Sequence, residues 1–162
     1  AFWQVANYRQ AYGLFCCTGI LANHESPLRP TRFVTQKIIQ GVKDISMGKS
    51  NELRLGNLDI WRDWGWAPEY VRAMYLILQA ETANDYLIAS GNTTSLRNFV
   101  ELAFRCAGLN HEEYLVTDTS FLRPSDLNYS SMDPTRIATE LGWRATTTPE
   151  EIVQRMYEER LN

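Results

Sequence analysis

Cysteines, histidines and long apolar runs are scarce in this 162-residue chain. The odd number of cysteines, three, and their spacing, with Cys16 and Cys17 adjacent, match neither a disulfide framework nor a metal site. No apolar run approaches the roughly 18 residues that a membrane span needs, and no secretory signal is visible at the start. We therefore expect a cytoplasmic protein with reduced cysteines, no metal ion and no membrane partner.

The chain also lacks the excess of positive charge that marks proteins binding nucleic acid through its phosphates. It has 16 Lys and Arg against 19 Asp and Glu, which gives a formal net charge of -3 and a pI near 5.4. We therefore expect no nucleic-acid partner. A composition of 44% hydrophobic and 12% aromatic residues is typical of a soluble globular protein with a real core.

Apolar strands alternate with amphipathic helices, and this pattern predicts an α/β fold. The apolar runs at residues 14–22 and 85–90 are typical of parallel strands buried on both faces, and shorter strands are expected at residues 53–55 and 113–117. Helices are expected at residues 2–12, where Gly13 ends the helix, and from a cap at Thr35 to near Gly48. A third helix is expected to start at Ala67, and a fourth to span residues 93–108. The last two are expected from Asp133 to Gly142 and after a capping box at residues 148–151.

Apolar residues at helical spacing predict which helix faces are buried. The expected faces are Val71, Met74, Tyr75 and Leu78 in the helix from Ala67, Leu96, Phe99, Val100 and Ala103 in the next, and Val153, Met156 and Tyr157 in the last. The two interior strands need more neighbours than the chain supplies, and the chain starts with Ala1 inside a helix pattern. We therefore expect a fragment that lacks part of its sheet.

Polar and charged residues gather at residues 23–37, directly after the first buried strand. Asn23, His24 and Glu25 would emerge at the carboxyl end of that strand, which is where ligands bind in open α/β sheets. Lys37 lies in the first turn of the following helix. A helix N-terminus with a lysine there suits an anion such as a diphosphate.

Three motifs carry more specific information: NHESPLRPTRFVTQKI at residues 23–38, LGNLDIWRDWGWAPEYV at residues 55–71 and FLRPSD at residues 121–126. In this order they closely resemble the GDP-mannose 4,6-dehydratase family, a branch of the extended short-chain dehydrogenases/reductases. The resemblance implies an α/β fragment, residues 1–162, in which the C-terminal part of a Rossmann-like parallel sheet is interleaved with a small α/β substrate-binding domain. The N-terminal Rossmann half, with its glycine-rich turn and catalytic Tyr-x-x-x-Lys, is expected to be absent.

The same resemblance implies a lyase when the protein is full length. Its members convert GDP-mannose to GDP-4-dehydro-6-deoxy-D-mannose, eliminating water with transient hydride transfer to NADP+. The chain has no Tyr-x-x-x-Lys, so we expect no catalytic residue in it and an inactive fragment. A homo-oligomer, dimer or tetramer, is implied for the full-length form. The alternatives are a nucleotide-sugar epimerase or reductase of the same superfamily and a non-catalytic nucleotide-sugar-binding module.

Matching the family's site residue by residue divides the candidates into two groups. His24 and Arg29 are expected to contact the NADP cofactor. The residues expected to bind the nucleotide-sugar are Asn23, Lys37, Arg62, Arg123 and Asp126. The chain departs from the family pattern at three positions: Leu28 replaces an arginine, Pro30 a glycine and Asp126 a glutamate.

Several candidates also have a purely structural interpretation. His24 could be a hydrogen-bonded histidine at a strand end, and Lys37 a solvated helix residue. Arg62 could pair with Asp59 or Asp63, although exposed pairs of this kind stabilise a fold by only about 0–1 kcal/mol.

For the remaining polar and aromatic residues of the motifs we favour structural roles. Glu25 and Ser26 are expected to fix the loop by hydrogen bonds from side chain to backbone. Trp61, Trp64 and Trp66 could stack on a base, but packing in a corner of the core is the preferred interpretation.

Overall fold

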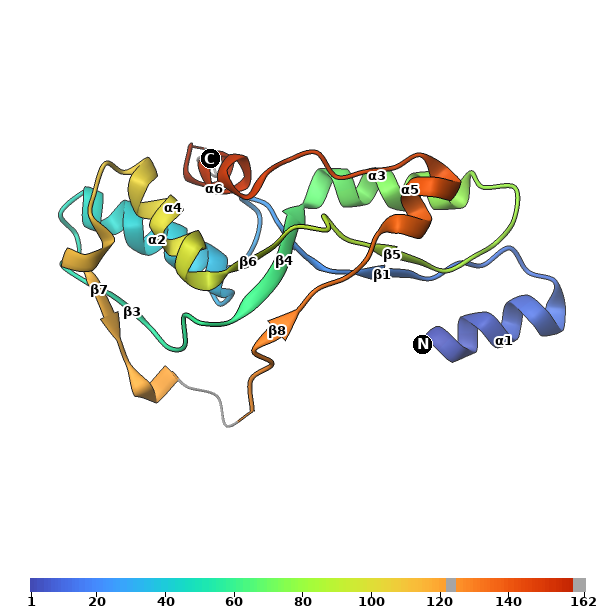
Figure 1. The fold of residues 1–162 in the computed structure, drawn as a ribbon, viewed down its shortest axis with the longest axis horizontal. Coiled ribbons are helices and arrows are strands. Elements are labelled where there is room, and N and C mark those ends of the chain that lie inside the picture. Colours follow the sequence, from blue (N-terminus) through green and yellow to red (C-terminus); the bar gives the residue numbers. More distant parts are fainter. Residues whose placement is uncertain (122–124, 159–162) are drawn as a thin grey trace.

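A computed structural model describes residues 1–121 and 125–158 and has the predicted α/β fold with parallel strand pairs. The elements form two packed groups with the long strand β4 between them (Figure 1). In these residues no helix combines the length and the apolar character needed to cross a membrane.

The first group is built on β1 (Gly19–Leu21) and β5 (Tyr86–Ile88), which pair in parallel with Gly19 opposite Tyr86. Helix α3 (Ala67–Leu78) contacts both strands, and α5 (Thr135–Leu141) contacts β5. Their shared core consists of Ala22, Tyr70, Ala73, Ile77, Tyr86, Ile88, Ala89, Ile137 and Trp143.

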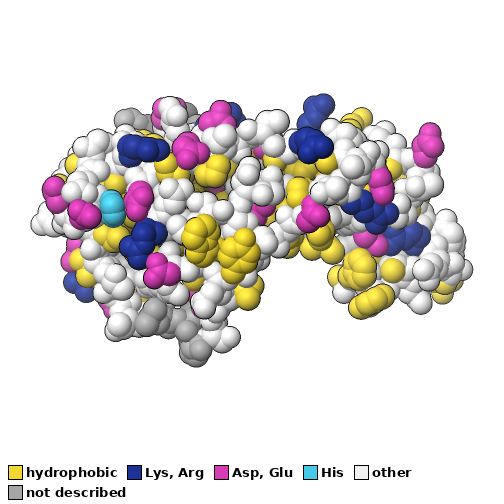
Figure 2. Space-filling view, in the orientation of Figure 1, with side chains coloured by type: hydrophobic (Ala, Val, Ile, Leu, Met, Phe, Trp, Pro, Cys, Tyr) yellow, Lys and Arg dark blue, Asp and Glu magenta, His cyan; other side chains and the backbone are white. Residues whose placement is uncertain are grey.

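Helix α1 (Phe2–Tyr12) lies at the edge of this group and buries none of its residues. Arg9 attaches it to the group through an ion pair with Asp85 at 2.6 Å. Trp3 is 81% exposed and Tyr12 69%. Hydrophobic side chains are accordingly visible at the end of the molecule where α1 lies (Figure 2).

The second group consists of α2 (Val34–Ser46), α4 (Leu96–Cys106) and α6 (Pro149–Glu158), which pack against one another. Beside α2 lies the parallel pair of β3 (Leu53–Leu55) and β7 (Leu115–Thr117). The core includes Ile38, Ile39 and Val42 from α2, Phe99, Val100 and Phe104 from α4, and Ile152, Val153 and Met156 from α6.

Strand β4 (Trp61–Trp66) joins segments from across the chain. It pairs in parallel with β2 (Asn23–Glu25) and β8 (Tyr129–Ser130), and antiparallel with β6 (Thr93–Ser95). Asn23 lies opposite Trp64, and Arg62 lies opposite Thr94 and Ser130. Two short 3-10 helices, η1 (His111–Glu113) and η2 (Thr119–Phe121), flank β7.

Several helix ends confirm the predicted local chemistry. Gly13 and Gly142 end α1 and α5 in left-handed conformations, with φ of 63° and 66°. The capping box of α6 is formed: Thr148 N donates to Glu151 at 2.8 Å, and Glu151 N donates to Thr148 at 3.3 Å. The predicted residues that are buried in α4 and α6 are Leu96, Phe99, Val100, Ala103, Val153 and Met156.

The prediction of one long strand at residues 14–22 was wrong. Leu14 and Phe15 are each 49% exposed and precede the strand. Ala22 N donates to Ile88 O at 2.9 Å, and beyond this bond the backbone leaves β5 and pairs with β4 as β2. Only Gly19–Leu21 of the apolar run are therefore in a strand, and the polar residues directly after the run form β2 in a different sheet.

The prediction that Thr35 caps α2 was also wrong. Phe33 is the N-cap residue, and the buried Thr35 hydroxyl donates to Glu25 instead. Helix α5 begins at Thr135, with Pro134 as its N-cap residue, and the Asp133 carboxylate accepts a hydrogen bond from Thr135 N at 2.9 Å.

The predicted buried face of α3 points outward. Val71, Met74, Tyr75 and Leu78 are 63%, 39%, 61% and 60% exposed, whereas Tyr70, Ala73 and Ile77 are buried. Both faces of this helix are apolar, so the periodicity alone cannot choose between them. Contact with β1, β2, β4 and β5 selects the face with the small Ala73.

Gly65 in β4 provides a test of this packing. A Cβ at Gly65 would lie 2.4 Å from Tyr70 Cε1, and Tyr70 is completely buried. We predict that Gly65→Ala lowers the free energy of unfolding by about 1–3 kcal/mol, because an overpacked core must shift. Gly41→Ala is the matched control, since the nearest atom to its Cβ, at 2.7 Å, is Cδ1 of Leu53, the end of an aliphatic side chain rather than a rigid ring. Urea denaturation measures both, and a larger loss at Gly41 than at Gly65 would contradict the prediction.

Candidate functional site

A cavity of about 580 Å³ lies between the start of α2, the end of β3 and the first part of β4. Its walls include Asn23, Arg29, Lys37, Arg62 and Asp126, five of the residues predicted to bind ligand. Residues far apart in the sequence therefore meet at one place. Arg123 lies outside the described residues, so its role stays a prediction.

The alternation of side chains along β2 separates Asn23 and Glu25 from His24. Asn23 and Glu25 line the cavity, whereas the His24 ring lies 5.3 Å from the ring of Tyr70 in α3. His24 Nδ1 lies 3.0 Å from Ala22 O. His24 therefore has two structural partners, the Tyr70 ring and the Ala22 carbonyl. The contact of His24 with a cofactor stays a prediction.

The Glu25 carboxylate is completely buried at the base of the loop that follows β2. Its Oε2 accepts from Thr35 Oγ1 at 2.6 Å and lies 3.1 Å from Arg29 Nε. Arg29 Nη1 also donates to His24 O at 2.8 Å. Glu25 therefore fixes the loop as expected, but through side chains rather than through the backbone.

Burial raises the pKa of Glu25 to about 7, because loss of water outweighs the opposing effects of the Thr35 hydroxyl and the Arg29 guanidinium. Among the described residues, no group donates a hydrogen bond to Glu25 Oε1. A buried carboxylate oxygen without a donor favours the protonated form further.

Cations on the cavity wall are held against aromatic rings. The Arg29 guanidinium lies 4.1 Å from the centroid of Phe33, and Lys37 Nζ lies 4.0 Å from the centroid of Phe121. Lys37 Nζ also donates to Arg54 O at 2.8 Å, so Lys37 is not the freely solvated residue of the structural alternative.

Arg62 pairs with a residue distant in the sequence. Its Nη2 donates to Asp126 at 3.2 Å and its Nη1 to Trp61 O at 2.8 Å. The expected alternatives were wrong, because Asp59 pairs with Arg97 and the buried Asp63 accepts from the Ser90 and Gly91 amides. A guanidinium held in this way keeps a fixed direction, which suits a diphosphate or a ribose edge.

The tryptophans of the second motif divide between core and surface. Trp64 and Trp66 are buried, as the core interpretation predicted. Trp61 is 43% exposed, and its ring lies 6.4 Å from that of Tyr129. Sequence reasoning missed Phe33 and Phe121 as walls of the cavity, although both stand inside the motifs next to predicted ligand-binding residues.

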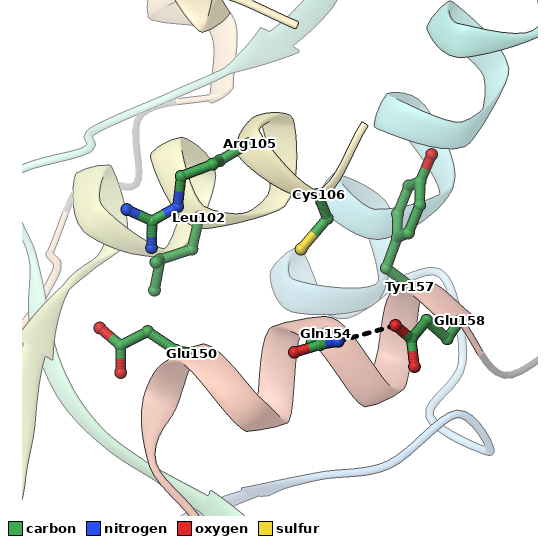
Figure 3. Close-up of a pocket in the computed structure, with 7 residues that line it drawn as sticks. All are labelled: Leu102, Arg105, Cys106, Glu150, Gln154, Tyr157 and Glu158. Atoms are coloured by element: carbon green, nitrogen blue, oxygen red, sulfur yellow. Dashed lines mark hydrogen bonds between the residues drawn. The ribbon is translucent and has the colours of Figure 1, made fainter. Parts of the chain in front are cut away.

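A second cavity, of about 360 Å³, lies between α4 and α6 and contains none of the predicted residues (Figure 3). Its wall carries Arg105 and the acidic residues Glu150 and Glu158, and Gln154 donates to Glu158 at 2.8 Å. Cys106 is an exposed residue, and partial loss of water around its thiol raises the pKa, which disfavours the reactive thiolate. In the part of the chain that the structure describes, no group of His, Cys, Asp or Glu could hold a metal ion.

The raised pKa of Glu25 predicts how stability depends on pH. Its folded pKa of about 7 exceeds the ordinary 4.5, so the folded state binds the proton more tightly than the unfolded state. The free energy of unfolding should therefore fall as the pH rises from about 4.5 to 7, by at most roughly 3 kcal/mol. Glu25→Gln should flatten this dependence in urea denaturation at a series of pH values. Equal slopes for wild type and variant between pH 5 and 7 would contradict it.

Comparison with known proteins gives a consistent result. The family model for GDP-mannose 4,6 dehydratase matches residues 1–156. The chain is 41% identical to GDP-mannose 4,6 dehydratase 2 of Arabidopsis thaliana, covering 99% of this chain and 43% of that protein. It is also 41% identical to GDP-mannose 4,6-dehydratase of Sinorhizobium fredii, covering 100% of this chain and 51% of that protein, and 38% identical to the human protein of that name.

Solved structures share the fold. RMD from Pseudomonas aeruginosa, solved with NADPH, superposes with a TM-score of 0.85 at 19% identity, over 96% of this chain and 50% of that one. UDP-glucose 4-epimerase from Thermotoga maritima, solved with UDP-glucose, superposes with a TM-score of 0.78 at 20% identity, over 96% of this chain and 49% of that one. The chain thus spans about half the length of the relatives that it matches. The three motifs, the shared fold and the match over residues 1–156 lead to one conclusion: the chain belongs to the GDP-mannose 4,6-dehydratase family.

Proposed function

We propose that this chain forms the substrate-binding part, and some of the cofactor-binding part, of a GDP-mannose 4,6-dehydratase. The complete enzyme would convert GDP-mannose to GDP-4-dehydro-6-deoxy-D-mannose. The observation that carries the proposal is the convergence of Asn23, Lys37, Arg62 and Asp126 on one cavity. Relatives about 40% identical to the chain carry the name of this activity.

The charges of the cavity suit a nucleoside diphosphate. Arg62, oriented by Asp126, and Lys37, in the first turn of α2, would hold the diphosphate. Asp126 would accept from ribose hydroxyls, and the exposed Asn23 amide would contact the sugar.

Arg29 fits a role in holding NADP, which would accept and return the hydride. Its side chain is 20% exposed at the cavity wall, where a planar set of donors can meet a phosphate. In our proposal the cofactor would also contact His24 on the opposite side of β2. The N-terminal half of the Rossmann domain would supply the remaining contacts and the catalytic residues.

We further propose a cytoplasmic enzyme that forms dimers or tetramers. The exposed aromatic side chains of α1 support an oligomer or a larger fold, because apolar surface of this kind usually lies in an interface. The three cysteines are free, in keeping with a reducing compartment. A nucleotide-sugar epimerase or reductase would share the fold, and product analysis would separate these reactions, since only the dehydratase removes the hydroxyl from carbon 6.

The proposal predicts that the chain binds GDP through Arg62. Losing a hydrogen bond to a charged group costs about 1.5–3 kcal/mol, so Arg62→Ala should weaken GDP binding about tenfold or more in isothermal titration calorimetry. Arg97→Ala is the matched control, because Arg97 makes an exposed ion pair with Asp59 and does not line the cavity. Equal affinity losses in both variants, or no GDP binding by the wild type, would contradict the proposal.

A second prediction concerns turnover. The chain has no Tyr-x-x-x-Lys, so with GDP-mannose and NADP+ it should form no 4-dehydro-6-deoxy sugar by mass spectrometry. Product formation by the 162 residues alone would show that the catalytic groups lie within them.

A further inference from the structure

We infer that Phe121 is the surface on which the nucleobase stacks, and that Asp118 and Arg54 position it. The inference rests on the proposed function, because it takes the ligand to be a nucleoside diphosphate. It assigns a role in binding the base to a residue outside the predicted set.

The ring of Phe121 is available to a ligand. The residue is 51% exposed and lines both the candidate cavity and a neighbouring cavity of about 440 Å³. Phe33, the other aromatic side chain on an outer wall, has Arg29 4.1 Å and Arg32 5.3 Å from its ring centroid. Lys37 Nζ lies 4.0 Å from the Phe121 centroid, so Phe121 has one cation beside its ring where Phe33 has two, and it is the more exposed residue, at 51% against 37%. Phe121 therefore offers the more accessible aromatic surface for a planar base.

Lys37 places positive charge beside this ring. Its Nζ lies 4.0 Å from the Phe121 centroid and donates to Arg54 O at 2.8 Å, which leaves N–H groups for a ligand. The ammonium group that would hold the diphosphate therefore lies beside the ring, so a base on Phe121 and a diphosphate on Lys37 can belong to one ligand. The guanidinium group of Arg62 lines the same cavity and would meet the diphosphate together with Lys37.

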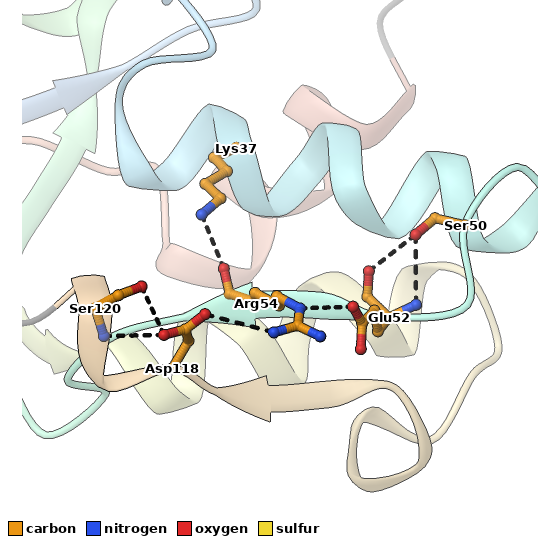
Figure 4. A network of polar contacts seen from close by, with 6 residues as sticks. All are labelled: Lys37, Ser50, Glu52, Arg54, Asp118 and Ser120. Atoms are coloured by element: carbon orange, nitrogen blue, oxygen red, sulfur yellow. Dashed lines mark hydrogen bonds and ion pairs between the residues drawn. The ribbon is translucent and has the colours of Figure 1, made fainter.

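Asp118 holds the turn that carries Phe121. Asp118 Oδ1 accepts from Ser120 N at 2.9 Å and from Ser120 Oγ at 2.6 Å, while Asp118 Oδ2 lies 3.5 Å from Arg54 Nη1 (Figure 4). Asp118 N donates to Leu55 O at 2.8 Å, and Phe121 N donates to Asp118 O at 3.2 Å. The turn is thereby attached to the end of β3.

Gly56 allows the turn to approach closely. A Cβ on Gly56 would lie 2.9 Å from the backbone oxygen of Phe121, a distance that would force the turn away. Two features therefore position Phe121: the missing side chain at Gly56 and the polar contacts of Asp118.

Arg54 offers a matched pair of variants. It pairs with Asp118 in the turn and with Glu52 in the segment before β3, at 2.6 Å (Figure 4). Asp118→Ala and Glu52→Ala each remove one carboxylate from the same guanidinium. Only Asp118→Ala also releases Ser120 and the turn.

The test measures binding of GDP and of inorganic pyrophosphate to the chain by isothermal titration calorimetry. Phe121→Leu should weaken GDP binding about tenfold and leave pyrophosphate binding unchanged, whereas Phe121→Tyr should retain GDP affinity. Asp118→Ala should weaken GDP binding and Glu52→Ala should not. The double variant Asp118→Ala, Phe121→Leu should bind GDP no more weakly than Phe121→Leu alone, because both changes act through one ring.

The outcomes separate this inference from the proposed function. If the wild type binds neither ligand, the proposed function fails and the inference with it. If the wild type binds GDP but Phe121→Leu changes neither affinity, or lowers both equally, the stacking role alone is wrong. Additive losses in the double variant would overturn the positioning role of Asp118, with thermal melting curves confirming that each variant is folded.

Discussion

The parallel pairing of β2 with β4 is the constraint on which the candidate site depends. It places Asn23 opposite Trp64 and so brings the loop that begins at Glu25 beside the strand that carries Arg62. β4 also pairs with β8, which follows Asp126 in the chain. A single strand thus gathers three segments that are remote in the sequence, and the cavity forms where they meet.

The charges in the cavity are arranged so that only part of the positive charge is neutralised. Glu25 pairs with Arg29 and Asp126 pairs with Arg62, whereas Lys37 meets a backbone carbonyl and an aromatic ring. The two acidic partners give the guanidinium groups fixed directions. The wall carries four cationic side chains, Arg29, Arg32, Lys37 and Arg62, against the two acidic ones, and the dipole of α2 adds positive charge at the start of the helix. An anionic ligand would find its donors already oriented, which lowers the entropic cost of binding.

The local sequence was sufficient to predict features of the helices that have a clear capping residue or apolar periodicity. The glycine ends of α1 and α5, the capping box of α6 and the buried face of α4 all follow from residues within a few positions of one another. The change of sheet between β1 and β2, on either side of Ala22, could not be predicted, because it depends on which distant strand supplies the partner. The prediction of the buried face of α3 was wrong for the same reason, because contacts with distant strands determine which of its two apolar faces is buried.

Five of the seven predicted site residues line one cavity, but the contacts among them were not predicted. Motif resemblance identified Asn23, Arg29, Lys37, Arg62 and Asp126, and these residues line one cavity. The pairing of Arg62 with Asp126 joins two motifs, and no spacing within either motif indicates it. The role of Phe121 as a wall likewise depends on the turn held at the end of β3.

The most direct test of the account is an NMR titration of the chain with GDP, following the backbone amides. The account predicts that the largest shift changes fall on Asn23, Arg29, Lys37, Arg62 and Asp126 and on their neighbours around the cavity. Shift changes concentrated on Leu102, Cys106 and Gln154, in the cavity between α4 and α6, would contradict it.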